Sequence, residues 1–264
     1  MYAFDRDTAI EPVLPGRWTA HFHERWNVAG VPNGGYVMAV AARALAGTLP
    51  HPHPLSVTAR FLRRPAPGRV GIVTDALHVG RRHSTGQARI LQDGEERARV
   101  VATFADQVAA EGPSLVVATP PDLPDPDELI SSVGQPGLPP VVRHFDHRFT
   151  PASMAFALGE RHGDPVAEGW TRFVDGREPD PISLLMFADA LPPPVLNVIE
   201  APWVPTIEMT VHVRAIPAPG WLAYRFSTRA LVDGYLDEDG ELWDSQGRLV
   251  AMSRQIALAL PADA

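Results

Sequence analysis

The stretch Gly34-Gly35-Tyr36-Val37-Met38-Ala39-Val40-Ala41-Ala42-Arg43-Ala44-Leu45 decides the fold class of this chain. Its residues are apolar on nearly every side of a helix, and Arg43 is the one charged side chain. A helix of that kind must be buried on most sides. We therefore predict a central helix rather than a surface helix, entered through a tight turn at Gly34-Gly35.

A second stretch repeats this pattern at Ile182-Ser183-Leu184-Leu185-Met186-Phe187-Ala188-Asp189-Ala190-Leu191. Asp189 is its only charged residue, and Pro192-Pro193-Pro194 follow directly. Proline cannot continue a helix, because it lacks the N–H that the helical hydrogen bond needs. The pattern predicts a second buried helix over 182–191.

Runs of β-branched and aromatic residues, separated by Gly, Pro or Asp turns, follow each predicted helix. After the first helix we expect strands at 55–62, 69–79, 83–92 and 97–104. After the second we expect strands at 206–215, 221–232 and 248–260, with a turn-rich stretch around Asp239-Gly240. One buried helix followed by consecutive antiparallel strands is an α+β arrangement. A sheet curled around the helix would bury it.

Three features recur in two parts of the chain in the same order. Pro65-Ala66-Pro67-Gly68 returns as Pro217-Ala218-Pro219-Gly220, with Thr58 and Thr210 at the same offset before it; His21-Phe22-x-x-Arg25-Trp26 returns as His144-Phe145-x-x-Arg148-Phe149, and the late turn Asp93-Gly94 as Gln246-Gly247. This repetition predicts a tandem duplication. We expect an N-terminal domain at 1–106, a proline-rich linker at 107–140 and a C-terminal domain at 141–264.

The composition excludes several classes of protein. The 264 residues are 45% hydrophobic and 20% charged, as in globular proteins; the chain has no cysteine, and all 23 basic residues are arginine. Disulfides, a Cys nucleophile, a Schiff-base lysine and a P-loop are thereby excluded. The net charge of −8 disfavours nucleic acid and anionic membranes as partners. Without a signal-like start or an apolar run of the ~18 residues that a membrane span needs, we expect a cytoplasmic protein.

Several segments carry a family resemblance through their order and spacing. They are the Gly34-Gly35 helix start, Ser56 to Pro65, Gly80-Arg81-Arg82-His83-Ser84, Trp170-x-Arg172, Leu185 to Leu191, Pro205-Thr206-Ile207-Glu208 and Ser253-Arg254-Gln255. With them the chain resembles the acyl-CoA thioesterase II family over nearly its whole length. The resemblance implies a tandem (double) hot-dog, in which each domain is a long central helix wrapped by an antiparallel β-sheet. It also implies hydrolysis of acyl-CoA to free acid and CoA without metal or bound cofactor.

The same resemblance implies the catalytic residues. The family uses an Asp in the second helix, a Thr at the start of the next strand and a Gln on the last strand, which here are Asp189, Thr206 and Gln255. The corresponding places in the first half hold Ala41 and Ala42, and Ala102 and Thr103. The N-terminal domain is therefore expected to be catalytically degenerate.

Hydrolysis of a thioester needs an oriented water, a group that takes its proton, and donors for the developing oxyanion. Asp189 would be the general base, with Thr206 and Gln255 fixing the water; direct attack by the carboxylate is the alternative. From the residues alone, Asp189 fits a helix-end role equally well, bonding nearby backbone. Two other functions stay open, a non-catalytic acyl-CoA or acyl-ester binding protein and an enoyl-CoA hydratase. The hydratase would want a His near the second helix, and none lies between Pro165 and Thr210.

Arginines and a glycine are candidates for substrate binding. The arginines Arg60, Arg63, Arg64, Arg81 and Arg82 cluster in the sequence and could bind the phosphates of CoA, although a solvated face is the simpler reading. Gly35 would let the substrate carbonyl approach backbone N–H groups at a helix start. No acidic set completes a metal site around His21-x-His23 or His51-x-His53. Exposed sheet edges would suit a homodimer.

Overall fold

The computed structural model of this protein describes residues 1–201 and 203–259. Within them the helices are α1 (Ala3–Asp7), α2 (Gly34–Ala46) and α3 (Ser183–Phe187), with 3₁₀ helices η1 (Glu24–Trp26), η2 (Pro126–Glu128), η3 (Pro140–His144), η4 (Ala152–Leu158) and η5 (Pro194–Asn197). The strands of the first half are β1 (Ile10–Leu14), β2 (Arg17–Phe22), β3 (Asn27–Val28), β4 (Val31–Pro32), β5 (His53–Phe61), β6 (Gly68–Val79), β7 (His83–Gln92) and β8 (Glu95–Ala105). Those of the second half are β9 (Ile130–Ser131), β10 (Phe145–Phe149), β11 (Val166–Phe173), β12 (Thr206–Val213), β13 (Leu222–Ser227), β14 (Leu231–Val232), β15 (Tyr235–Trp243) and β16 (Leu249–Leu258).

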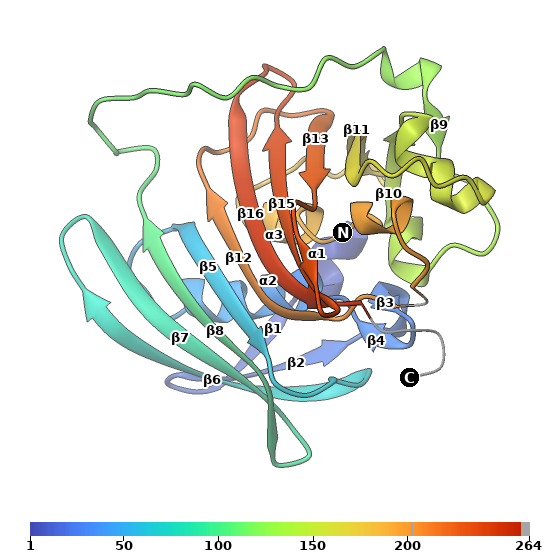
Figure 1. Ribbon diagram of the computed structural model, residues 1–264. Coiled ribbons are helices and arrows are strands. Elements are labelled where there is room, and N and C mark those ends of the chain that lie inside the picture. Colours follow the sequence, from blue (N-terminus) through green and yellow to red (C-terminus); the bar gives the residue numbers. More distant parts are fainter. Residues whose placement is uncertain (202, 260–264) are drawn as a thin grey trace.

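One antiparallel sheet runs through both halves. In the described part of the chain its order is β1-β2-β6-β7-β8-β5-β12-β16-β15-β13-β11-β10-β9, with β14 added beside β15. Figure 1 shows the blue-to-green strands of the first half continuing into the orange and red strands of the second. Because β5 pairs with β12, backbone hydrogen bonds join the two halves directly. The predicted α+β class with a large antiparallel sheet is confirmed.

The internal repeat corresponds to a two-fold relationship between the halves. Thr58 on β5 lies opposite Thr210 on β12, and their hydroxyl oxygens are 2.9 Å apart. The two Pro-Ala-Pro-Gly segments lie at equivalent places, between β5 and β6 and between β12 and β13. His21-Phe22 and His144-Phe145 do not lie at equivalent places in the two halves. β2 pairs directly with β6, whereas β11 separates β10 from β13, the counterpart of β6.

α2 is the central helix of the first half, as predicted. Asn33 caps its start by accepting a hydrogen bond from the Tyr36 N–H. Ten of its 13 residues are buried, and β5, β6, β7 and β8 pack around it. No helix in the described ranges is long and apolar enough to cross a membrane.

The second helix is much shorter than the range 182–191 predicts. α3 ends at Phe187, and a turn follows in which the Asp189 N–H bonds the Met186 oxygen at 3.1 Å. Pro181 limits the start of the helix, because the residue before a proline avoids helical backbone angles. Pro192 restricts only Leu191 in this way, so proline does not explain why α3 ends at Phe187. Among the described residues, a long central helix is therefore present in the first half only.

Most strands lie close to the predicted runs, but the stretch around Asp239-Gly240 is not a turn. It forms the middle of β15, whose inward residues are Leu236, Glu238, Gly240 and Leu242 and whose outward residues are Asp237, Asp239 and Glu241. The acidic outward residues give this strand the composition of a loop. The run 221–232 divides into β13 and β14, and the predicted end of the last strand, Leu260, lies outside the described residues.

The proline-rich segment is partly attached to the second half. Within the predicted linker 107–140, Ile130–Ser131 forms β9, which pairs with β10. Nearby, Trp170 donates to the Pro124 oxygen at 3.0 Å and Arg148 to the Pro126 oxygen at 3.1 Å. The part before η2 contains no helix or strand and crosses from β8 toward β9 along the top of Figure 1.

Candidate active site

Asp189 lies where the end of α3 meets the start of α2. The main-chain N–H of Gly35 donates to its Oδ2 at 2.8 Å, and the Asn33 side chain donates to its main-chain oxygen at 2.7 Å. Asn33 also caps α2, so one side chain fixes both the helix start and the Asp189 backbone. The carboxylate thus sits at the N-terminus of a helix from the other half, where the partial positive charge of the helix favours it.

Two glycines allow this close approach. A Cβ on Gly35 would lie 2.6 Å from the Leu185 oxygen, and a Cβ on Gly34 would lie 2.9 Å from Asp189 Oδ2. Any larger residue would therefore push α2 and α3 apart. The sequence predicts that Gly35 lets the substrate carbonyl approach N–H groups at a helix start, whereas in the structure the Gly35 N–H holds Asp189. Gly35 thus positions the carboxylate.

The surroundings of Asp189 shift its acidity. Burial raises the pKa of this carboxyl to about 6. The hydrogen bond from the Gly35 N–H is the largest cause that opposes the rise, and the nearby donors of Asn33 and Gly34 add to it. At neutral pH the group is mostly ionised, yet it is basic enough to accept a proton. This combination suits a general base.

Thr206 and Gln255 are joined on neighbouring strands. The Thr206 hydroxyl, at the start of β12, donates to Gln255 Oε1 on β16 at 2.6 Å. Gln255 Nε2 donates in turn to Glu238 Oε1 on β15, also at 2.6 Å. Glu238 is not among the predicted site residues, because the sequence predicts a turn in this part of the chain. The inward place of Glu238, between Leu236 and Gly240, is the signal that could have revealed it.

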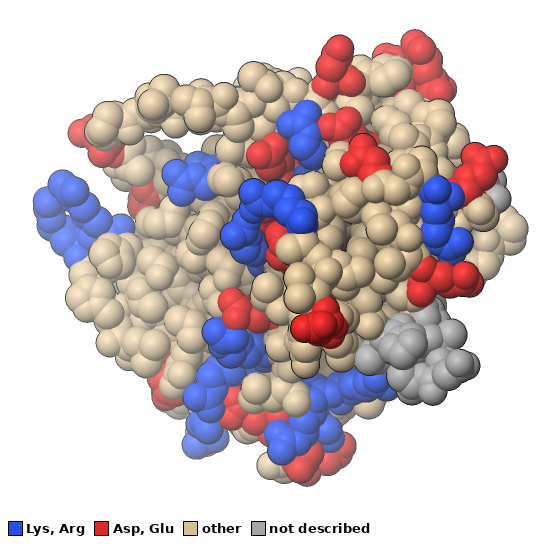
Figure 2. Space-filling view, in the orientation of Figure 1, with Lys and Arg blue, Asp and Glu red and all other residues tan. Residues whose placement is uncertain are grey.

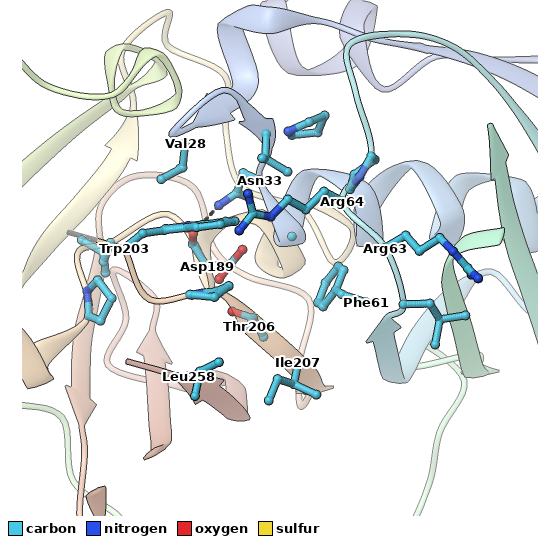
Figure 3. Close-up of a pocket in the computed structure, with 18 residues that line it drawn as sticks. Val28, Asn33, Phe61, Arg63, Arg64, Asp189, Trp203, Thr206, Ile207 and Leu258 are labelled. Carbon is cyan, nitrogen blue, oxygen red and sulfur yellow. Dashed lines mark hydrogen bonds between the residues drawn. The ribbon is translucent and has the colours of Figure 1, made fainter. Parts of the chain in front are cut away.

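Two cavities meet at Asp189. The smaller, about 380 Å³, is lined by Asn33, Gly34, Phe61, Asp189 and Thr206 among others. In Figure 3 the oxygens of Asp189 and Thr206 face each other in this space. The larger cavity, about 650 Å³, is mostly apolar and is lined by 130–142, η4 and the residues that follow α3. It occupies the region beyond the end of this short helix, and Trp203 lines both cavities.

Two of the five candidate arginines lie at the smaller cavity. The Arg64 guanidinium lies 4.1 Å from the centre of the Trp203 ring, across the cavity from Thr206 (Figure 3). Arg63 lines the same cavity but extends away from Asp189 and pairs with Glu95 at 3.2 Å. Of the pair, Arg64 is better placed to meet a substrate.

The structure does not bring the other three to the site. Arg60 pairs with Glu208 across the β5–β12 junction. Arg81 and Arg82 lie in the turn between β6 and β7, where the Arg81 oxygen contacts His51, beyond the far end of α2. Since α2 is about 20 Å long, that turn is remote from Asp189. Arginines also mix with acidic side chains over the face in Figure 2, which fits solvated ion pairs for most of them.

The first half lacks the polar set at the equivalent places. By the sheet register, Pro54, Ala102 and Gly86 correspond to Thr206, Gln255 and Glu238. A Cβ on Gly86 would lie 3.1 Å from Leu45, near the end of α2. In the first half the long helix therefore reaches the place that corresponds to Glu238.

Comparison with known proteins identifies the family. Residues 22–105 match the model of the acyl-CoA thioesterase N-terminal domain, and residues 117–259 match that of the C-terminal domain. The chain therefore belongs to the acyl-CoA thioesterase family, and the predicted resemblance is confirmed. A protein from Thermobifida fusca YX, assigned as a thioesterase II, is 31% identical, with a TM-score of 0.91 and coverage of 99% of this chain and 98% of its own.

Two further relatives extend the comparison. A hot-dog-fold protein of unknown function from Alicyclobacillus acidocaldarius is 23% identical, with a TM-score of 0.88 and coverage of 99% of each chain, which shows the shared fold. An uncharacterized protein of Mycobacterium tuberculosis is 28% identical over 260 residues, covering 89% of this chain and 88% of its own.

Proposed function

We propose that this protein hydrolyses acyl-CoA thioesters to a free acid and CoA, with Asp189 activating the attacking water. The observation that carries the proposal is the position of this carboxylate. It lies at the junction of two cavities, beside Thr206, and is held by the Gly35 N–H at 2.8 Å. Its raised pKa, about 6, suits a base that works near neutral pH.

The reaction then follows from the contacts. Asp189 takes a proton from water as the water oxygen attacks the thioester carbonyl carbon. Thr206, held by Gln255, fixes the water from the other side of the smaller cavity. The tetrahedral intermediate collapses with cleavage of the C–S bond, and Asp189 returns the proton to the departing CoA sulfur. General-base catalysis of this kind contributes roughly 10²- to 10⁴-fold to the rate.

The two cavities suggest places for the two parts of the substrate. The acyl chain would enter the larger, mostly apolar cavity, where each buried CH₂ group contributes about 0.8 kcal/mol. CoA would leave through the smaller cavity, past Arg64, whose guanidinium can bind a phosphate through two hydrogen bonds.

We assign one active site to the chain and place its reactive groups in the C-terminal domain. Pro54, Ala102 and Gly86 offer no side-chain carboxyl, hydroxyl or amide at the equivalent positions of the N-terminal domain. That domain instead supplies the start of α2, which holds Asp189. The N-terminal domain is thus degenerate in catalysis but necessary to the site.

The test is release of free thiol from a panel of acyl-CoA substrates. The Asp189→Asn variant should lose at least about 100-fold in kcat while its melting temperature stays within a few degrees. Asp75→Asn, an exposed change on β6, is the matched control and should behave as wild type. Retained turnover in Asp189→Asn would reject the role of Asp189. Binding of acyl-CoA without thiol release by the wild type would instead identify a binding protein.

A further inference from the structure

β15 carries a single carboxyl group on its inward side. Glu238 is only 6% exposed, whereas the acidic residues on either side of it, Asp237 and Asp239, point outward. Burying a carboxyl among apolar residues costs free energy unless the group has hydrogen-bond partners. The partners of Glu238 therefore indicate what it does.

Those partners lead to the proposed active site. Glu238 Oε1 accepts a hydrogen bond from Gln255 Nε2 at 2.6 Å, and the other end of the same amide accepts one from Thr206 at 2.6 Å. Glu238 Oε2 is also buried and has no hydrogen-bond partner in the described part of the chain. An amide bonded at both ends cannot rotate without losing two hydrogen bonds.

We propose that Glu238 is a positioning residue of the hydrolytic site, whose carboxyl group holds the Gln255 amide in the orientation that meets Thr206. This inference rests on the proposed function, since it concerns the residues that fix the attacking water. Glu238 would act through Gln255 and would not touch the substrate.

The charge state of Glu238 follows from its surroundings. Burial is the main cause that raises its pKa, to about 8; the charge of Asp189 adds to the rise, and the hydrogen bond from Gln255 opposes it. At neutral pH the group is therefore protonated and adds no negative charge beside Asp189. Above about pH 8 it ionises, and the second charge would oppose the developing oxyanion.

The other charged groups around this strand face away from the site. Asp239, which adds a smaller contribution to the same rise, pairs with Arg254 and Arg229 on the outer side. Arg225 on β13 pairs with Glu168 at 2.6 Å and Glu241 at 3.6 Å. Asp189 is thus the charged group on the inward side whose negative charge acts on Glu238. Gln255 and Thr206, on the neighbouring strands β16 and β12, are neutral.

The first test is the pH profile of kcat. The wild type should lose activity above about pH 8, and Glu238→Gln, which cannot ionise, should lose this alkaline decline. Glu238→Leu, which removes the acceptor for Gln255, should lower kcat at neutral pH roughly ten-fold or more, with a smaller change in KM. Glu241→Gln, an outward change on the same strand, is the matched control and should keep the wild-type profile. A wild-type kcat at neutral pH in Glu238→Leu overturns the proposal.

A second test does not depend on turnover. The carboxyl carbon of Glu238 can be followed by ¹³C NMR through a pH titration, with its signal identified by its loss in Glu238→Gln. Its midpoint should lie near 8 in the wild type and should fall in Asp189→Asn, because a neighbouring negative charge has been removed. A midpoint near the ordinary value of 4.5, or one that Asp189→Asn leaves unchanged, overturns the charge state assigned to Glu238. Turnover by Asp189→Asn would separately reject the proposed function.

Discussion

The main-chain N–H of Gly35 donates to Asp189 Oδ2 at 2.8 Å, across the boundary between the two halves of the chain. The helix start that holds the carboxylate and the segment that carries it are 154 residues apart in sequence. The β5–β12 pairing keeps these two parts in register. The candidate site is therefore formed by both halves of the chain, and neither half contains it alone.

Replacing Gly35 by alanine should disturb the site directly. The added Cβ would lie 2.6 Å from the Leu185 oxygen, so α2 and α3 must separate. We expect a loss of about 1–3 kcal/mol in the free energy of unfolding, measured with urea, together with a lower kcat. Gly112→Ala is the control, because a Cβ there meets nothing within 4 Å. Equal stability of the two variants would contradict the close helix contact.

The activity of the wild type should rise with pH around a midpoint near 6. Asp189 accepts a proton only when it is ionised, and burial raises its pKa to about 6, so activity is lost as the pH falls through that value. His147 cannot cause this limb, because burial lowers its pKa to about 3. The measurement is kcat/KM against pH in buffers of constant ionic strength. A midpoint near 4 would show that Asp189 behaves as a solvated carboxylate.

Removal of Arg64 should weaken binding of CoA esters. Arg64→Ala should raise KM several-fold and reduce its dependence on salt, because a phosphate contact is screened by ions. Arg81→Ala, in the remote β6–β7 turn, serves as the control and should leave KM near the wild-type value. If Arg64→Ala keeps the wild-type KM and salt dependence, as expected of Arg81→Ala, Arg64 does not contact the substrate.

Filling the larger cavity should change the preference for chain length. Met154 on η4 lines this cavity, so Met154→Trp should reduce kcat/KM for long acyl chains and leave short ones nearly unaffected. Met252→Trp adds the same bulk at an exposed site on the outer side of β16 and should change neither. Equal effects on all chain lengths in Met154→Trp would place the acyl chain elsewhere.

Features encoded by local pattern were predictable from the sequence. The apolar run from Gly34 to Leu45 forms the buried α2, and the repeated Pro-Ala-Pro-Gly segments mark the two-fold relationship. The length of α3 does not follow from the sequence pattern, because Pro192 predicts an end near Leu191 and the helix ends at Phe187. β15 was missed because its outward acidic residues hide the alternation that a strand requires.

The site was harder to predict, because it depends on contacts between distant segments. Nothing near Gly35 in the sequence shows that its N–H meets Asp189, since that contact requires both helices to be packed. Arg81 and Arg82 resemble Arg63 and Arg64 in sequence, yet α2 separates the two pairs in space. The place of Glu238 beside Gln255 follows from the pairing of β15 with β16, which the sequence does not show.

The brevity of α3 has a consequence for how such an enzyme can arise. In an assembly of two identical subunits, both central helices have the same length. The space beyond the helix end is then either filled in both subunits or open in both. A single polypeptide is free of that symmetry, because a substitution in one half leaves the other half unchanged. Within one chain, one half can therefore keep a long buried helix while the other has a short helix with a cavity beyond its end.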